Sequence, residues 1–215
     1  MKWSAEAWSE ITPIFDKILS LPFIKELTAG TLPKNKFIFY MEQDSIYLSS
    51  YVQVLSHIAS RMPWEDFRSQ LLEFAVDGIN VEKAIHHTFL AGESKDDTVA
   101  TPTTLLYTSL LKAQAYSPIE VEMASVLPCF WVYQRIGETI LANAHLESNT
   151  YRKWIETYAD RRFALSTQAA IDICDKLASE ATPEIRREMT HIFIIATKME
   201  MLFWQSAYNL EEWKI

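Results

Sequence analysis

One of the two cysteines of the chain lies next to a proline, within Leu127–Tyr133 (LPCFWVY). The neighbouring residues favour a long helix, in which a proline removes a backbone hydrogen bond at a cost of about 3 kcal/mol. Tyr133 lies four residues after Cys129 and therefore shares its helical face. A small hydrophobe in a core is the usual role of a buried cysteine, and Cys174 fits that role. The costly proline and the polar neighbour indicate instead that Cys129 faces a ligand.

A carboxyl group lies in the middle of an apolar helical face in the segment 193–204. On a helical wheel Glu200 falls with Phe193 and Trp204, whereas Lys198 falls on the opposite face. A glutamate in this position is either the buried partner of a cation or a catalytic acid whose pKa is raised. We favour the catalytic acid.

A second carboxyl group lies between tyrosines. Tyr40, Asp44, Tyr47 and Tyr51 follow one another at steps of four, three and four residues, so they share one helical face. A buried carboxylate must be hydrogen-bonded or must shift its pKa. Two interpretations stay open: a structural aspartate held by tyrosine hydroxyls, or a carboxyl group with a functional role.

Glu82 and His86 form another pair four residues apart. Helical bundles can build di-iron sites from such pairs, but that design needs matching carboxylates and histidines on other helices. The remaining histidines have no carboxylate at the required offset on an evident inner face. The sequence therefore predicts a buried Glu–His hydrogen bond and no metal site.

The elements that must position these residues are predicted to be long helices that begin at prolines. Only four of the 215 residues are glycine, whereas sheets need many tight turns. No internal repeat or long linker divides the chain, so we predict an all-α, single-domain, multi-helix bundle of about seven or eight helices over residues 1–215. The predicted helices are 4–21 (capped by Ser4), 22–30, 33–61, 63–91, 101–116, one from 117 onward that carries Cys129, 150–181 and 182–210, with a long loop over 92–100.

The composition excludes several classes of function. The net charge is −8, from 20 basic and 28 acidic residues without a basic face, so no nucleic-acid partner is expected. No apolar run approaches the ~20 residues that span a bilayer, and no signal peptide is evident, so no membrane partner is expected. Two cysteines make no disulfide framework, which favours a cytoplasmic protein. The acidic balance mildly favours a neutral or cationic small-molecule substrate.

Further short segments stand in a specific order along the chain. They are Gly30–Pro33, Gln43–Leu48, Pro102-Thr103 with Tyr107-Thr108, Leu127–Cys129 with Trp131 and Tyr133, Tyr151 with Lys153–Ile155 and Thr157-Tyr158, and Glu200 with Phe203-Trp204 and Ala207-Tyr208. Each segment alone carries little information. Together they make the chain resemble the TenA family, the thiaminase II branch of the haem-oxygenase-like helical fold, over essentially its whole length.

The resemblance implies a pocket within each helical domain and a homotetramer. It also implies a hydrolase of thiamin salvage, which converts 4-amino-5-aminomethyl-2-methylpyrimidine to 4-amino-5-hydroxymethyl-2-methylpyrimidine and ammonia. Cleavage of thiamin to hydroxymethylpyrimidine and thiazole is the related slower activity. This chemistry requires no metal or organic cofactor.

The resemblance also implies roles for individual residues in the cysteine-containing branch of the family. Cys129 falls on the nucleophile and Glu200 on the proton-donating glutamate. Because Cys129 is mid-helix, without the benefit of a helix N-terminus, we expect a tyrosine hydroxyl to activate it. The other positions grip the pyrimidine (Asp44, Tyr133 and Tyr158) or flank and tune the thiol (Tyr47 and Tyr107).

Two other functions are compatible with this fold. The first is a non-catalytic pyrimidine- or thiamin-binding or regulatory protein, although binding alone needs neither Cys129 nor Glu200. The second is a haem- or di-iron-dependent oxidative enzyme, which a colourless, metal-free and still hydrolytic preparation would exclude.

Overall fold

The computed structural model describes residues 2–89, 98–144 and 146–214, with side chains given for all of these except 81–89 and 146. Helices and connecting turns account for the described residues, and no strand occurs among them, which confirms the predicted all-α class. The α-helices are α1 (Trp3–Leu19), α2 (Pro22–Ala29), α3 (Lys34–Arg61), α4 (Glu65–Phe89), α5 (Pro102–Ala113), α6 (Ile119–Asn143), α7 (Arg152–Tyr158), α8 (Arg161–Glu180) and α9 (Pro183–Asn209), with 3-10 turns η1 (Gln114–Tyr116) and η2 (Leu146–Ser148).

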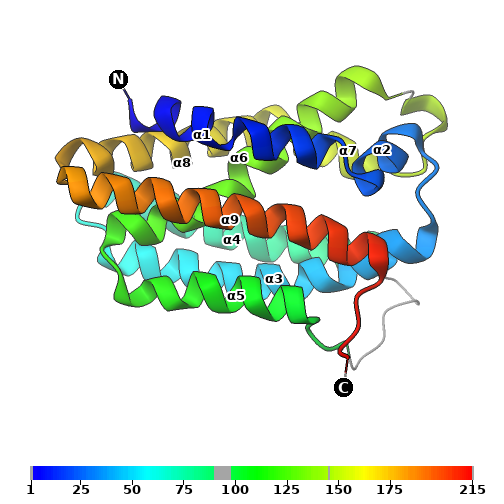
Figure 1. The fold of residues 1–215 in the computed structure, drawn as a ribbon, viewed down its shortest axis with the longest axis horizontal. Coiled ribbons are helices and arrows are strands. Elements are labelled where there is room, and N and C mark those ends of the chain that lie inside the picture. Colours follow the sequence, from blue (N-terminus) through cyan, green and yellow to red (C-terminus); the bar gives the residue numbers. More distant parts are fainter. Residues whose placement is uncertain (1, 90–97, 145, 215) are drawn as a thin grey trace.

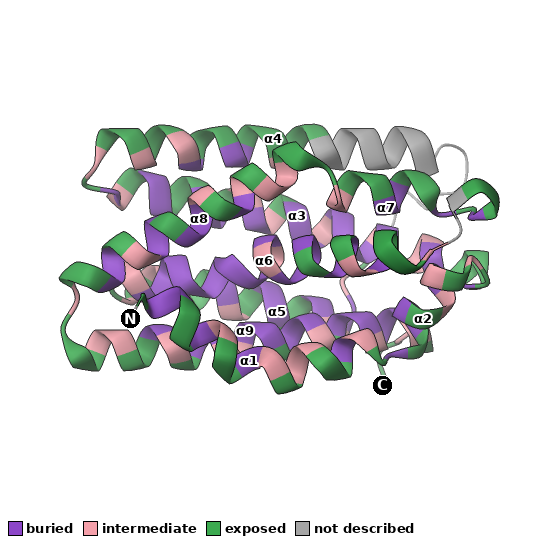
Figure 2. Cartoon of the chain, turned by 90° about the horizontal axis from the view of Figure 1, so that it is seen from above, coloured by how far each residue is buried: buried purple, intermediate pink, exposed green. Residues whose placement is uncertain are grey.

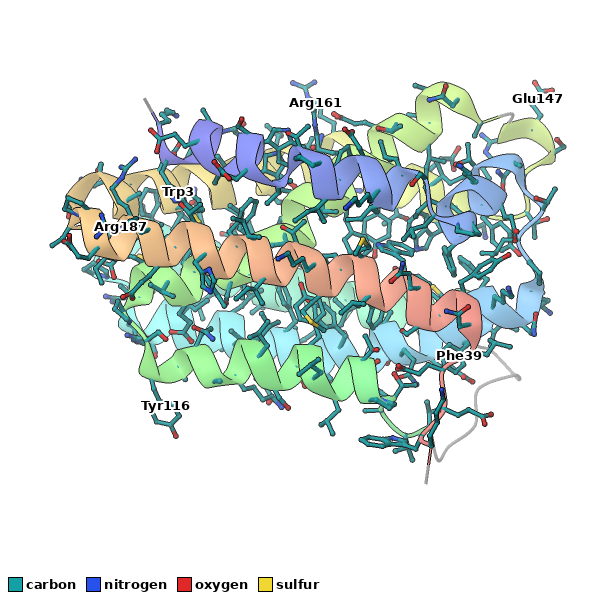
Figure 3. The ribbon with its side chains drawn as sticks, viewed as in Figure 1. Trp3, Phe39, Tyr116, Glu147, Arg161 and Arg187 are labelled. Atoms are coloured by element: carbon teal, nitrogen blue, oxygen red, sulfur yellow. The ribbon has the colours of Figure 1, made fainter. Side chains whose placement is uncertain are left out.

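The long helices lie side by side along one axis of the molecule (Figure 1). Seen from above, α6 runs through the middle of the bundle, while α4 and α1 form opposite edges with their exposed residues facing outward (Figure 2). Side chains at the periphery, such as those of Tyr116 and Arg161, point away from the ribbon (Figure 3). The protein therefore places α6, the helix that carries Cys129, where it is covered from both sides.

Aromatic side chains from distant parts of the chain meet in the core. The rings of Tyr40 and Trp204 stack with centroids 4.8 Å apart and planes 12° apart. Trp204 also packs 5.1 Å from Phe23 and edge-on to Trp154 at 5.8 Å. Aromatic pairs of this kind contribute beyond the apolar area that they bury. They hold α2, α3, α7 and α9 in fixed positions.

Prolines and small polar residues begin helices largely where the sequence predicts. Pro22 and Pro102 occupy the first turns of α2 and α5, and Pro183 opens α9. The Thr101 and Thr182 side chains cap the last two of these by accepting from backbone N–H groups. α6 continues through Pro128 as one helix from Ile119 to Asn143.

The predicted role of Ser4 as a helix cap is wrong. Helix α1 begins one residue earlier, at Trp3, and Lys2 at the cap position provides no side-chain hydrogen bond. Ser4 instead lies in the first turn, where its backbone N–H and its hydroxyl each donate to the Asp175 carboxylate at 2.8 Å. A carboxylate from α8, distant in sequence, thus satisfies a donor that a local cap would otherwise bind.

The predicted single helix over 150–181 is also wrong, because the chain divides there into α7 and α8. Asp160 lies between them and caps α8, since its carboxylate accepts from the N–H of Arg162 at 2.6 Å. The end of α7 packs tightly on α6: a Cβ placed on Gly137 would lie 2.6 Å from the carbonyl carbon and oxygen of Tyr158. The break between α7 and α8 lets Tyr158 approach α6 this closely.

An ionic cluster around the buried carboxylate of Glu122 joins the end of α3 to the start of α6. The Glu122 carboxylate is buried and accepts from His57 Nδ1 at 2.7 Å and from the Arg61 guanidinium. Arg61 also donates to the carbonyl of Ser117 at 2.7 Å. Local spacing did not reveal a carboxylate for His57, because its partner lies on another helix. Burial makes such a cluster costly unless every charge is paired, so it fixes how α3 and α6 align.

The close contact at Gly137 makes a first prediction. Gly137→Ala forces a methyl group into the Tyr158 backbone, so we expect the free energy of unfolding to fall by about 2 kcal/mol, and Tyr158 to shift. Urea unfolding measures the loss.

Gly78→Ala is the matched control, because it gains the same helix propensity. Its Cβ would meet only the Cγ2 methyl group of Val52, at 2.9 Å, which a side-chain adjustment can relieve. Equal losses of stability in the two variants would contradict the account of the α6–α7 contact.

Candidate active site

A cavity of about 770 Å³ opens between α3, α4, α6, α7 and α8. Four of the seven predicted site residues line it: Asp44 from α3, Cys129 and Tyr133 from α6, and Tyr158 from α7. The other three, Tyr47, Tyr107 and Glu200, are buried and do not line the cavity. The cavity thus presents the thiol to a ligand, with three further predicted residues buried outside its lining.

The Cys129 thiol lies half-buried in the wall of this cavity. Burial raises its pKa well above the ordinary value of a thiol, and the negative charge of a nearby Glu200 carboxylate would raise it further. The hydroxyl of Tyr47 is close enough to oppose this increase, and the hydroxyl of Tyr51 also lies beside the thiol. The thiol is therefore protonated in the resting protein at neutral pH.

Tyr47 places a buried hydroxyl beside the thiol. Its ring stacks on Tyr51 and packs against Tyr107, with centroid distances of 5.5 and 4.8 Å. Among the described residues, the hydroxyl has no partner that meets ordinary hydrogen-bond geometry. A buried phenol without a partner is costly, so this hydroxyl is ready to donate to a thiolate once one forms.

Glu200 lies on α9, where only 1% of its surface is exposed. Burial raises the pKa of its carboxyl group to about 8, although a hydrogen bond from Tyr107 works in the opposite direction. The Tyr107 hydroxyl donates to Glu200 Oε1 at 2.7 Å. Glu200 is therefore predominantly neutral at pH 7, the state in which a carboxyl group can give up a proton.

The location of Tyr107 bears on the choice between the two predicted activators of the thiol. Its hydroxyl is engaged by Glu200, whereas the hydroxyl of Tyr47 has no partner of ordinary geometry. Tyr47 is thus the better candidate for the donor to Cys129, and Tyr107 orients the carboxyl group instead.

Three phenols surround the part of the cavity next to Asp44. The rings of Tyr133 and Tyr158 lie 5.1 Å apart, and the Tyr40 hydroxyl donates to that of Tyr133 at 3.4 Å. Burial raises the pKa of each hydroxyl, so all three remain neutral, and Tyr133 and Tyr158 keep a hydrogen to donate. The Asp44 carboxyl group is itself buried, as its position on the predicted tyrosine face required.

Part of the cavity wall is made of residues that were not among the predicted site residues. Tyr51 lines it, and Phe74, Phe130 and Phe163 form an apolar side, with Phe74 and Phe130 5.1 Å apart. Tyr51 could have been found, because it continues the stripe of Asp44. The three phenylalanines carry no local signal, since they are brought together from α4, α6 and α8.

Metal-ligating residues do not gather in the part of the chain that the structure describes. No group of three histidine, cysteine, aspartate or glutamate side chains is close enough there to hold an ion. The side chains of Glu82 and His86 lie outside the described residues, so their expected hydrogen bond stays a prediction.

The arrangement of the helices matches a known structural class. A domain from Shewanella denitrificans OS217 described as having a heme oxygenase-like fold superimposes with a TM-score of 0.75 at 13% identity, covering 96% of this chain and 92% of its own. The present protein therefore has a haem-oxygenase-like helical fold. The chain belongs to the TENA/THI-4/PQQC family, whose sequence profile matches residues 8–210.

Individual relatives are similar over nearly the whole chain. An aminopyrimidine aminohydrolase from Bacillus subtilis (strain 168) is 31% identical over 221 residues, which cover 99% of this chain and 92% of the relative. The structure of a TenA homologue from P. horikoshii OT3 has a TM-score of 0.87 and 27% identity, covering 97% of this chain and 99% of the other. The expected fold and family are thereby confirmed.

The raised pKa of Glu200 predicts how stability changes with pH. The folded protein holds this proton up to about pH 8, whereas an unfolded chain loses it near 4.3. This contribution to the free energy of unfolding is complete below the unfolded pKa and is lost as the pH rises towards 8. Glu200→Gln has no such proton to lose. Between pH 5 and pH 8 its free energy of unfolding should therefore rise by on the order of 3 kcal/mol relative to that of wild type.

Urea unfolding of wild type and Glu200→Gln at pH 5 and pH 8 measures this difference. Glutamine can still accept from Tyr107, so the substitution keeps the hydrogen bond and removes only the proton. A difference between the two proteins that is the same at both pH values contradicts a raised pKa at Glu200.

Proposed function

We propose that the protein is an aminopyrimidine aminohydrolase with thiaminase II activity. It converts 4-amino-5-aminomethyl-2-methylpyrimidine and water to 4-amino-5-hydroxymethyl-2-methylpyrimidine and ammonia. It also cleaves thiamin to hydroxymethylpyrimidine and thiazole, which places it in thiamin salvage. The observation that carries the proposal is a thiol at the wall of an aromatic cavity, with a neutral buried carboxyl group nearby. The similarity to a relative named for this reaction supports it.

The cavity suits a flat, polar heterocycle. The Tyr133 and Tyr158 rings provide surfaces for stacking, and the Asp44 carboxyl group provides hydrogen bonds to the edge of the ring. The volume of about 770 Å³ leaves room beyond a single pyrimidine, towards Phe74 and Phe163. A thiazolium group attached to the same methylene can therefore enter with the pyrimidine.

The first step joins the sulfur to the substrate. A direct displacement at the methylene is slow, because an amine is a poor leaving group. The Cys129 sulfur instead adds to the electron-poor ring, and a ring nitrogen receives the electron pair and a proton. Because the thiol begins neutral, its proton must leave as the bond forms. It passes to the ring nitrogen by way of the Asp44 carboxyl group or the Tyr158 hydroxyl, both of which line the cavity. Tyr47 donates to the sulfur while it is negatively charged.

The second step breaks the bond between the methylene and the leaving group. Electrons from the ring form an exocyclic double bond, and the leaving nitrogen departs with its bonding pair. Glu200, which is neutral at pH 7, gives its proton to the departing amine, so ammonia is released. Tyr107 keeps hold of the resulting carboxylate through its 2.7 Å hydrogen bond.

The third step consumes water and restores the thiol. Water adds to the methylene and loses a proton to the Glu200 carboxylate, which regenerates the acid. The electron pair returns to the ring, the carbon–sulfur bond breaks, and the sulfur regains the proton that the ring nitrogen took up in the first step. The ring leaves as the hydroxymethylpyrimidine. Each group of the protein ends in the state in which it began.

The wider setting is part of the same proposal. Residues 1–215 act as one domain that forms a homotetramer in the cytoplasm and needs no cofactor. The continuous core from α1 to α9 supports a single folding unit. None of the described helices has the length and apolar composition of a membrane span.

Substitution of the proposed nucleophile tests the reaction. Cys129→Ser should lower the rate of ammonia release from the aminomethylpyrimidine by at least about 10³-fold, because a serine hydroxyl at this position has no base able to ionise it. Thiamin cleavage should fall in parallel. Wild type quenched during turnover should show the mass of one pyrimidine adduct on the peptide that contains Cys129.

Cys174→Ala is the matched control, since Cys174 is the other thiol and is buried in the core away from the cavity. Its ammonia release should remain close to that of wild type per folded molecule. Equal rates of ammonia release in wild type and Cys129→Ser would contradict the covalent mechanism. Binding of the pyrimidine without turnover by wild type would indicate a binding protein instead.

A further inference from the structure

Tyr51 lies next to the thiol, yet no part of the proposed reaction uses it. Its hydroxyl donates to the carbonyl oxygen of Val126 at 2.8 Å, and this bond is buried. A helix carbonyl points towards the C-terminal end, so an atom bound to it lies about one turn farther along. Cys129 is three residues after Val126 and on the same face. The Tyr51 oxygen is therefore close to the sulfur, and both residues line the cavity.

The two tyrosines beside the thiol have different hydrogen-bonding capacities. A phenol has one hydrogen to donate and can accept through its oxygen. Tyr51 has already donated its hydrogen to Val126, so towards the sulfur its oxygen can only accept. The Tyr47 hydroxyl has no partner of ordinary geometry among the described residues and keeps its hydrogen. Their rings stack 5.5 Å apart, which holds the two hydroxyls on one side of α6.

We propose that Tyr51 is a positioning residue for Cys129: its oxygen accepts the S–H hydrogen and thereby turns the sulfur lone pairs towards the ligand. Its bond to Val126 keeps the phenol in the orientation that accepts. Tyr47 then has the separate task of donating to the sulfur after the hydrogen has left. The inference rests on the proposed function only in assigning the sulfur a role as nucleophile.

Several other groups act on the same sulfur and must be constant in any test. Asp44 faces it from α3 and Glu200 from α9. Tyr107 of α5 and Tyr158 of α7 are also near enough to interact with it. The cavity is also lined by uncharged Phe74 and Phe163, and by charged side chains of three helices: Asp77 of α4, Lys153 and Glu156 of α7, and Arg162 of α8. Single Tyr→Phe substitutions leave all of these groups in place.

The test compares how fast iodoacetamide alkylates Cys129 at different pH values in Tyr51→Phe and Tyr47→Phe. Only the thiolate reacts, so the profile follows the thiol pKa. Tyr51→Phe removes an acceptor from the neutral thiol, so its profile should move to lower pH than that of wild type. Tyr47→Phe removes a donor to the thiolate, so its profile should move to higher pH. Mass spectrometry separates Cys129 from the buried Cys174.

The turnover of the aminomethylpyrimidine gives a second measurement on the same variants. A misdirected sulfur reacts slowly but leaves the ring contacts intact, so Tyr51→Phe should lower kcat by about 10-fold and change KM by less than about twofold. An unchanged kcat, or an alkylation profile that stays in place or moves to higher pH, overturns the proposal.

Tyr151→Phe is the matched control for the loss of a phenol–carbonyl hydrogen bond. Tyr151 is buried and its hydroxyl donates to the carbonyl of Leu32 at 2.5 Å, outside the cavity. Its kcat and alkylation profile should equal those of wild type. Changes in Tyr151→Phe as large as those in Tyr51→Phe would reduce the role of Tyr51 to general stability and overturn the proposal.

Wild type provides a readout that does not depend on any tyrosine variant folding. An S–H group that donates to oxygen has its infrared stretch at lower frequency than a free thiol, and the band of Cys129 is assigned by its loss in Cys129→Ser. A band at the frequency of a free thiol overturns the proposal. Alkylation and infrared spectra need no substrate, so failure of the aminohydrolase activity alone is distinguishable from failure of this inference.

Discussion

The burial of two titratable groups in the space between α3, α6 and α9 is the constraint on which the site depends. A thiol and a carboxyl group share this space, and burial makes the charged form of each costly. A Glu200 carboxylate also disfavours the thiolate of Cys129, and the charge of Asp44 disfavours the Glu200 carboxylate. The Cys129 thiol and the Glu200 carboxyl group are therefore both protonated at rest. A ligand with an electron-poor carbon and a proton-accepting group can react with both of them.

Tyrosine hydroxyls supply hydrogen bonds to the buried polar groups of this site. Tyr107 binds the carboxyl group, Tyr51 binds a carbonyl of α6, and Tyr40 binds Tyr133. A phenol suits these places because it buries a large apolar ring and still supplies one donor. The site is consequently held by neutral hydrogen bonds, while the ion pair of Glu122 and Arg61 joins the start of α6 to the end of α3, apart from the chemistry.

The faces of individual helices could be predicted well from the sequence. Asp44 and Glu200 were expected on inward faces because a helix repeats every 3.6 residues, and both are buried. Predictions that depended on contacts between helices were less successful. Ser4 binds Asp175 in place of capping its own helix, and the break before α8 accompanies the contact of Tyr158 with Gly137. Neither partner is near in sequence, so no local pattern indicated these contacts.

By itself the sequence determined that the chain forms long amphipathic helices, which residues face inward, and which family the motifs resemble, since all three depend on order and spacing along the chain. Only the tertiary structure decided which hydroxyl meets which acid. From the sequence, Tyr47 and Tyr107 were equivalent candidates for the hydrogen-bond donor to the thiol. The packing of α5 on α9 brings the Tyr107 hydroxyl to Glu200 instead. Hydrogen bonds form over about 3 Å, and residues 93 positions apart come that close only when the helices pack.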